Sequence, residues 1–142
     1  MNGAEISQLI GTTWEGKGEL WLDPLGDEAI RYGCTARVDA GAVTYTWHHE
    51  GKKHEGRLSF AGERPTFVDS WHQQKHVECR TLADAWGLLA LDYTYGAGEG
   101  PPWGWRIVLS RRPSGELVLQ MTNVTPWGEE ARAVRMVFVR KS

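Results

Sequence analysis

The sequence lacks any long hydrophobic run. Nowhere among its 142 residues does it approach the ~20 consecutive apolar residues that a membrane-spanning helix needs. The opening stretch, MNGAEISQLIG, has neither the positive start nor the apolar core of a secretory signal peptide. These absences predict a cytoplasmic protein that has no membrane partner.

An excess of positive charge is missing too. The chain has 16 Lys and Arg against 18 Asp and Glu, a formal net charge of -2. The basic residues are scattered and form no stripe that could neutralise a row of phosphates. Nucleic acid is therefore not an expected partner.

Cysteine is scarce, with only Cys34 and Cys79 in the chain. The two could form one bridge by number alone, but without export we expect a reducing compartment and free thiols. A chain of this length buries roughly two-thirds of its unfolded surface without disulfides or metals. We therefore expect a single domain over residues 1–142 that needs no cofactor for its stability.

Tryptophan and glycine, by contrast, are abundant. There are eight Trp and 17 Gly but only three Phe. Each indole ring combines a large apolar area with an N–H group that needs a partner. Such residues suit the lining of a barrel as well as a compact core, so composition leaves both interpretations open.

Apolar and polar residues alternate from about residue 12 onward, which is typical of half-buried strands. Val43, Tyr45 and Trp47 share one face of such a strand, and Glu50-Gly51-Lys52-Lys53 then reads as a hairpin turn. Glycine or proline stands at most of the other expected reversals. The predicted strands are 13–22, 28–39, 42–50, 53–61, 65–72, 75–80, 87–95, 103–112, 116–124 and 131–140.

Short connections between these strands predict antiparallel pairing of neighbours, because parallel pairs need long crossovers. An all-β, up-and-down barrel of about 8–10 strands is favoured over a sandwich, since closure removes exposed edges. Helical structure is expected only at Ala4 to Ile10, with a second candidate turn at Thr81 to Ala85.

The opening Leu9-Ile10-Gly11-Thr12-Thr13-Trp14-Glu15-Gly16 resembles the start of lipocalins and related calycins. The resemblance implies that Trp14 packs at the closed end of the barrel beneath an arginine of the last strand. Here the spacing is Gly-x-x-Trp, one residue longer than in that family. The arginine could be Arg132, Arg135 or Arg140.

Three further segments extend the resemblance over nearly the whole chain: Trp14-Glu15-Gly16, Asp69-Ser70-Trp71-His72 and Gly100-Pro101-Pro102-Trp103-Gly104-Trp105-Arg106. They are similar to a bacterial family of calycin-like domains, the domain of unknown function 1579. This implies a barrel like that of lipocalins or fatty-acid-binding proteins, without a chemistry to transfer. Nitrobindins, a neighbouring group, bind haem through a late histidine, whereas the last histidine here is His76.

Aromatic residues at alternating positions of four predicted strands are the strongest functional signal. If they line one cavity, they form an apolar pocket with indole and phenol donors, the usual composition of a small-molecule site. The alternative is that they fill the barrel as core. The predicted ligand-binding residues are Tyr45, Trp47, His49, Trp71, Tyr93, Tyr95, Trp103, Trp105 and Asn123.

The five histidines all lie in the middle third of the chain. Alternation places His49 on the inward face and His72 on the face of Val68 and Ser70, away from Asp69. His49 with His54 or His72 and Asp69 could hold a transition metal, although no spacing matches a metal signature.

Besides a haem- or metal-binding barrel, three functions remain open. The leading hypothesis is a non-catalytic protein that binds a small hydrophobic or aromatic molecule inside the barrel. The first alternative is an enzyme with His49 as acid or base beside Asp69; a triad of Asp69, Ser70 and His72 is disfavoured because alternation separates Asp69 from Ser70. The second is a homodimer whose tryptophan-rich face is the interface.

Overall fold

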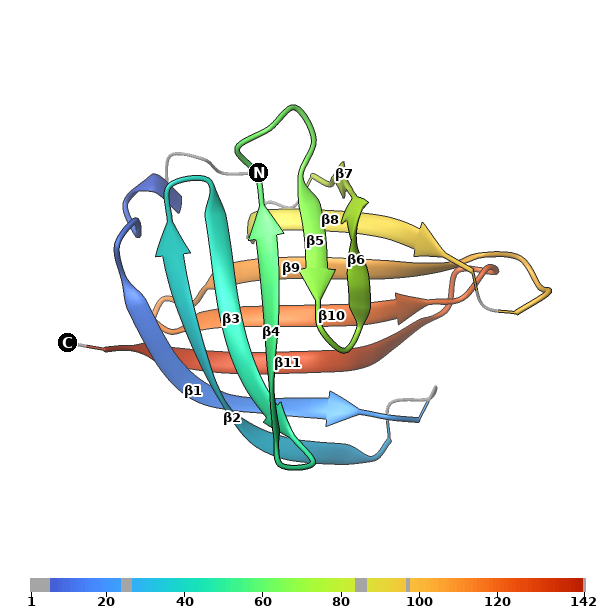
Figure 1. The fold of residues 1–142 in the computed structure, drawn as a ribbon, viewed down its shortest axis with the longest axis horizontal. Coiled ribbons are helices and arrows are strands. Elements are labelled where there is room, and N and C mark those ends of the chain that lie inside the picture. The colour runs from blue at the N-terminus through green and yellow to red at the C-terminus, as the bar shows by residue number, and fades with distance from the viewer. Residues whose placement is uncertain (1–5, 24–26, 84–86, 97, 142) are drawn as a thin grey trace.

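The computed structural model describes residues 6–23, 27–83, 87–96 and 98–141. This part of the chain is almost entirely antiparallel β-structure (Figure 1). Its eleven strands are β1 (Thr13–Trp21), β2 (Ala29–Asp39), β3 (Ala42–His49), β4 (Lys52–Ser59), β5 (Thr66–Asp69), β6 (Gln73–Glu78), β7 (Arg80–Thr81), β8 (Gly87–Tyr95), β9 (Trp103–Arg111), β10 (Leu117–Val124) and β11 (Glu130–Arg140). The all-β prediction is confirmed, and the predicted strand boundaries are close to those observed.

Hydrogen bonding joins the strands in the order β6-β5-β4-β3-β2-β1-β11-β10-β9-β8-β7. Sequential neighbours therefore pair, and β1 pairs with β11 to bring the two ends of the meander together. β6 and β7 end this order but are consecutive in the chain, separated by Cys79 alone. The chain thus passes from one half of the sheet to the other at this corner, which leaves a nearly closed barrel. In Figure 1, β3 to β6 run across β8 to β11 behind them.

The observed strands differ from the predicted ones in two places. The short β7 is an additional strand, which brings the total to eleven. The predicted strand 65–72 ends early, at Asp69, because residues 70–72 form a turn. Thr81 lies in β7 rather than in a helical turn, and residues 84 and 85 of that prediction lie outside the described residues.

A short helical turn, described from Ile6 onward, covers the end of the barrel where β1 starts; residues 4 and 5 of the predicted helix lie outside the described residues. The side chains of Ile6 and Leu9 are buried there. The Thr12 hydroxyl donates to the Leu9 carbonyl oxygen at 2.5 Å and accepts from the Trp14 indole N–H at 2.9 Å. This end of the barrel is therefore closed by packed side chains. In the described part of the chain, we find no helix with the length and apolar character needed to cross a membrane.

Arginines of the last strand lie near both tryptophans of β1: Arg140 is opposite Trp14 in the β1–β11 register, and Arg132 contacts Trp21. Trp14 is fully buried at the closed end. The guanidinium of Arg132 lies over the ring of Trp21, 4.5 Å from its centre, at the opposite end of β1. An arginine of the last strand thus lies over Trp21, and the cover of Trp14 by an arginine stays a prediction.

Side chains fill the interior of the barrel. Inward positions from nearly every strand form one hydrophobic cluster, in which Trp47, Phe67 and Phe138 have no exposed surface. Cys34 and Cys79 are both buried and both free, as expected. Much of the aromatic content is thus core, and any ligand must find space among these side chains.

Candidate functional site

Most of the aromatic and ionisable side chains that could bind a ligand lie at the end of the barrel opposite the N-terminal turn. Because all pairs are antiparallel, the ends of β3, β5, β8 and β10 meet the starts of β2, β4 and β9 there. We call this region the open end. It holds, by position along their strands, Tyr32, Trp47, His49, His54, Asp69, Tyr93, Trp105 and Asn123.

Aromatic and imidazole rings form a connected group at the open end. Trp47 is its centre, with ring-centre distances of 4.6 Å to His54 and 5.4 Å to His72. His72 also contacts Trp105 of β9 at 5.1 Å, so it joins the two halves of the barrel. We define the ring cluster as Tyr32, Trp47, His49, His54, Trp71, His72 and Trp105.

Asp69 lies beneath the ring cluster and has no exposed surface. One carboxylate oxygen accepts hydrogen bonds from the Tyr45 hydroxyl at 2.6 Å and from the Trp47 indole N–H at 3.2 Å. The other accepts from the backbone N–H groups of Trp71 and His72, at 2.8 and 3.0 Å. This turn, in which an aspartate binds its own backbone two and three residues on, orients Trp71 and His72 toward the open end.

Burial controls the ionisation of the groups around Asp69. It lowers the pKa of His72 to about 4; the Asp69 carboxylate opposes this shift and His54 adds to it. Burial and then the Asp69 charge raise the pKa of Tyr45 well above its ordinary value. At neutral pH, His72 is therefore an uncharged imidazole and Tyr45 a protonated donor.

Trp105 carries a polar group without a partner. Its side chain is 7 % exposed. Its Nε1 and the Nε of Arg135 are the buried side-chain nitrogen or oxygen atoms that lack a hydrogen bond within the described ranges. A buried donor left unsatisfied costs about 1–3 kcal/mol, and native proteins keep few of them. The Trp105 N–H is thus a vacant donor inside the ring cluster.

A second group of predicted residues lies beside the ring cluster. Tyr93 contacts Phe67 across the corner of the barrel, with ring centres 5.9 Å apart, and Tyr95 at 6.4 Å. The Tyr95 hydroxyl donates to the amide oxygen of Asn123, which lies opposite Trp105 in the β10–β9 register. Asn123 is therefore already hydrogen-bonded by a tyrosine.

Not all the predicted ligand-binding residues come together. Trp47, His49, Trp71 and Trp105 are in the ring cluster, and Tyr45 lies below it through Asp69. Trp103 instead contacts Trp127, with ring centres 6.3 Å apart. Trp71 is 40 % exposed, so its side chain lies partly at the surface of the open end rather than inside the barrel.

The sequence prediction was wrong about His72. Strand alternation placed it with Val68 and Ser70, but the turn after Asp69 and the register shift between Phe67 and Asp69 break the alternation. His72 therefore packs among the tryptophans. Asp69, His54 and Tyr32 were also absent from the predicted ligand-binding set. The Asp-Ser-Trp-His stretch is a turn signal that could have identified Asp69 and His72.

The proposed metal ligands do not assemble. Among the described residues, we find no group of three or more His, Cys, Asp or Glu side chains placed to hold a metal ion.

The enzymatic alternatives have little geometric support. Asp69 already accepts four hydrogen bonds, and Ser70 contacts His54 at 3.1 Å rather than His72.

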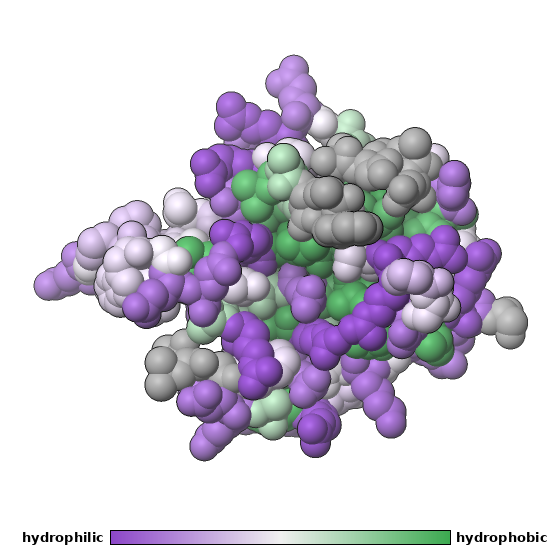
Figure 2. Space-filling model, turned by 180° about the vertical axis from the view of Figure 1, so that it is seen from behind, coloured by the Kyte–Doolittle hydropathy of each residue, from purple (hydrophilic) through white to green (hydrophobic). Residues whose placement is uncertain are grey.

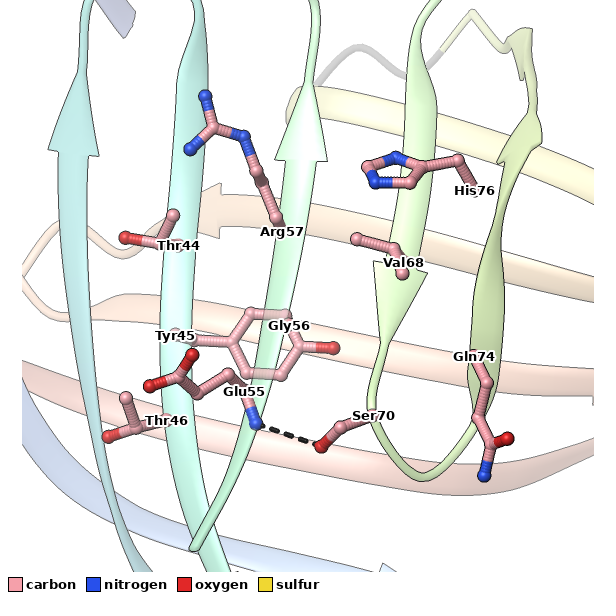
Figure 3. Close-up of a pocket in the computed structure, with 10 residues that line it drawn as sticks. All are labelled: Thr44, Tyr45, Thr46, Glu55, Gly56, Arg57, Val68, Ser70, Gln74 and His76. Carbon is pink, nitrogen blue, oxygen red and sulfur yellow. Dashed lines mark hydrogen bonds between the residues drawn. The ribbon is translucent and has the colours of Figure 1, made fainter.

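The largest of the five surface hollows that we describe, about 560 Å³, lies on the outer face of β3 to β6 (Figure 3). Most of its lining residues have polar side chains, among them Ser70, whose hydroxyl accepts from the Glu55 backbone N–H. The Tyr45 ring lies beside Gly56 in its floor. Of the predicted ligand-binding residues, Tyr45 alone lines this hollow, and no member of the ring cluster does.

The tryptophans within the described ranges do not form one exposed face. Trp47 and Trp105 are buried, whereas Trp71 and Trp127 are exposed on different loops. Figure 2 shows the side opposite that of Figure 1, where polar side chains interrupt the apolar ones.

No protein-family model matches this chain, and no curated protein matches it significantly. What the open end can do therefore follows from its own geometry and chemistry.

Proposed function

We propose that this protein is a non-catalytic binding protein for a small hydrophobic or aromatic molecule, held by the ring cluster at the open end of a calycin-like barrel. The observation that carries the proposal is the meeting of rings from both halves of the barrel around a turn fixed by Asp69. Small-molecule sites combine such apolar and aromatic walls with a few fixed polar groups.

The solvent exposure of the rings decreases from the surface of the ring cluster into the barrel. Trp71 is half-exposed, His72 is partly buried, and Trp47 is fully buried. A flat ligand at the mouth can therefore meet ring edges first and ring faces deeper in. Offset-stacked and edge-to-face arrangements of this kind stabilise aromatic pairs beyond simple burial.

The polar content of the open end favours binding over simple packing. A core built only for stability uses apolar side chains, because buried polar groups are costly unless they are satisfied or used. Here a buried carboxylate needs four donors to support a turn whose side chains, Trp71 and His72, face the mouth. The energetic cost of burying this carboxylate is explained if the turn that it supports presents a binding surface.

The test is a titration with the neutral fluorescent probe N-phenyl-1-naphthylamine. We expect saturable binding by the wild-type protein and a several-fold weaker affinity in Trp71→Ala, which removes the exposed part of the ring cluster. Trp127→Ala is the matched control, since Trp127 is 69 % exposed and contacts Trp103 instead. Absence of saturable binding, or equal effects of the two substitutions, would contradict the proposal.

A second measurement needs no chosen probe. Native mass spectrometry of the protein purified from its own host can be compared with the same sample after denaturation. A mass difference that disappears on denaturation would identify a retained ligand by its mass. We expect that difference to be absent or reduced in Trp71→Ala and present in Trp127→Ala.

A further inference from the structure

The His72 imidazole occupies the space between the two halves of the barrel. Its ring lies 5.4 Å from that of Trp47 on β3, with an interplanar angle of 23°, and 5.1 Å from that of Trp105 on β9, at 37°. Trp71 meets it edge-on at 4.8 Å. A flat, five-membered heteroaromatic ring is thus already accommodated among three indoles.

Trp105, one of the rings that contact His72, carries a vacant indole N–H. Trp105 contacts His72 and is 7 % exposed, and its Nε1 has no hydrogen-bond partner. Indole N–H groups only donate. The chemistry that completes this site is therefore a hydrogen-bond acceptor in the plane of a flat ring.

Charge is disfavoured at this position. Burial, with a further contribution from His54, lowers the pKa of His72 to about 4, although the Asp69 carboxylate attracts a proton there. A cation would meet the same desolvation, and an anion would also meet the charge of Asp69. A neutral molecule avoids both costs.

We propose that the position of the His72 imidazole is the binding place of a neutral, flat heteroaromatic molecule, which displaces His72 and accepts a hydrogen bond from Trp105 Nε1. The inference rests on the proposed binding function and names its ligand class. Displacement requires only side-chain rotation, because the backbone N–H groups of residues 71 and 72 remain bonded to Asp69. Trp71, on the exposed side, can move with His72.

The test compares two probes of nearly the same shape, quinoline, whose ring nitrogen accepts a hydrogen bond, and naphthalene, which has no acceptor. Each competes with N-phenyl-1-naphthylamine in the wild-type protein and in Trp105→Phe, which keeps an aromatic ring but removes the N–H. Because water solvates the two probes differently, each probe is compared with itself across the two proteins. We expect quinoline to weaken about five- to tenfold more than naphthalene in the variant.

A readout in the unmodified protein covers the case in which Trp105→Phe folds poorly. Of the eight indole N–H signals in a nitrogen-correlated NMR spectrum, we expect one to shift strongly downfield with quinoline and much less with naphthalene. Equal responses to the two probes would overturn the inferred hydrogen bond.

His72→Ala tests the displacement. We expect both probes to bind several-fold more tightly, because no side chain has to leave the site. Weaker binding would show that the imidazole stays in place when a ligand binds and would overturn this inference.

The two proposals fail in different ways. If the wild-type protein binds N-phenyl-1-naphthylamine but quinoline and naphthalene weaken equally in Trp105→Phe, the ligand class is wrong and the binding function stands. If the wild-type protein binds none of the three compounds, both proposals are wrong.

Discussion

The hydroxyl of Tyr45 donates a 2.6 Å hydrogen bond to the carboxylate of Asp69, and both residues are fully buried. This bond links the middle of β3 to the end of β5. Together with the indole N–H of Trp47, it fixes the carboxylate so that its other oxygen can hold the turn at residues 70–72. The orientation of the ring cluster therefore depends on one acid.

Replacement of Asp69 by asparagine should destabilise the fold. Four donors surround the carboxylate, and the amide NH₂ group of Asn would face donors where an oxygen now accepts. We expect a loss of about 2–4 kcal/mol in the free energy of unfolding, measured by urea denaturation. Asp92→Asn is the control, because its partner Arg80 is exposed and solvent screens the pair. Equal losses in the two variants would show that the Asp69 network does not stabilise the fold.

Gly56→Ala should also destabilise the protein. A Cβ atom at Gly56 would lie 2.0 Å from Cζ of the buried Tyr45 ring, which Asp69 holds in place. We expect a loss of about 1–3 kcal/mol or more, read from thermal or urea unfolding. Gly33→Ala serves as the comparison, since an added Cβ there meets no atom within 4 Å. If both alanine variants unfold alike, the close packing of Tyr45 against β4 is wrong.

Stability should fall as the pH drops from about 6.5 to 4. Burial lowers the pKa of His72 from its ordinary value of 6.5 to about 4, so in this window the unfolded chain binds a proton that the folded protein excludes. The stabilisation associated with the uncharged His72 is complete above the pKa of the unfolded state and is lost as the pH falls toward the pKa of the folded state. The free energy of unfolding should change by on the order of 3 kcal/mol. His72→Phe removes this titration but keeps a ring. Its free energy of unfolding should therefore decline less over the same window, and parallel curves for the two proteins would contradict the burial of His72.

The two thiols should react slowly in the folded protein. Burial raises the pKa of Cys34 to about 12 and, together with the Asp92 charge, that of Cys79 to about 11. Little thiolate is then present at neutral pH, and the thiolate is the reactive form. We expect a colorimetric disulfide reagent to label both thiols at once in denaturant and far more slowly in buffer. Rapid labelling of the folded protein would show that these strands open readily.

The strands were predictable because alternation is a local property. Val43, Tyr45 and Trp47 share a face in the sequence pattern and are all buried in the barrel. The same alternation correctly placed His49 beside Trp47. In these stretches no bulge or turn interrupts the period of two residues, so each side chain keeps its expected face.

Alternation failed where the chain turns after Asp69. His72 was assigned to the wrong face, and Asp69, the acid that positions it, was considered only for metal binding and catalysis. The cause is physical: one unpaired residue or an early turn reverses the face of every side chain that follows. Trp103 keeps its alternation with Trp105, yet it contacts Trp127 instead of the ring cluster.

By itself, the sequence determined an antiparallel meander of short strands, the faces of most of them and an aromatic-rich interior, because these follow from residue spacing. Only the tertiary structure decided which rings meet. The Asp69 hydrogen bonds and the His72 contacts join residues from distant strands; Trp47 and Trp105, which both contact His72, are 58 residues apart in the sequence. The burial of Trp105 without a partner for its N–H is also a result of this packing. Such contacts depend on barrel closure and on one local turn, and neither is encoded in the periodicity of a single strand.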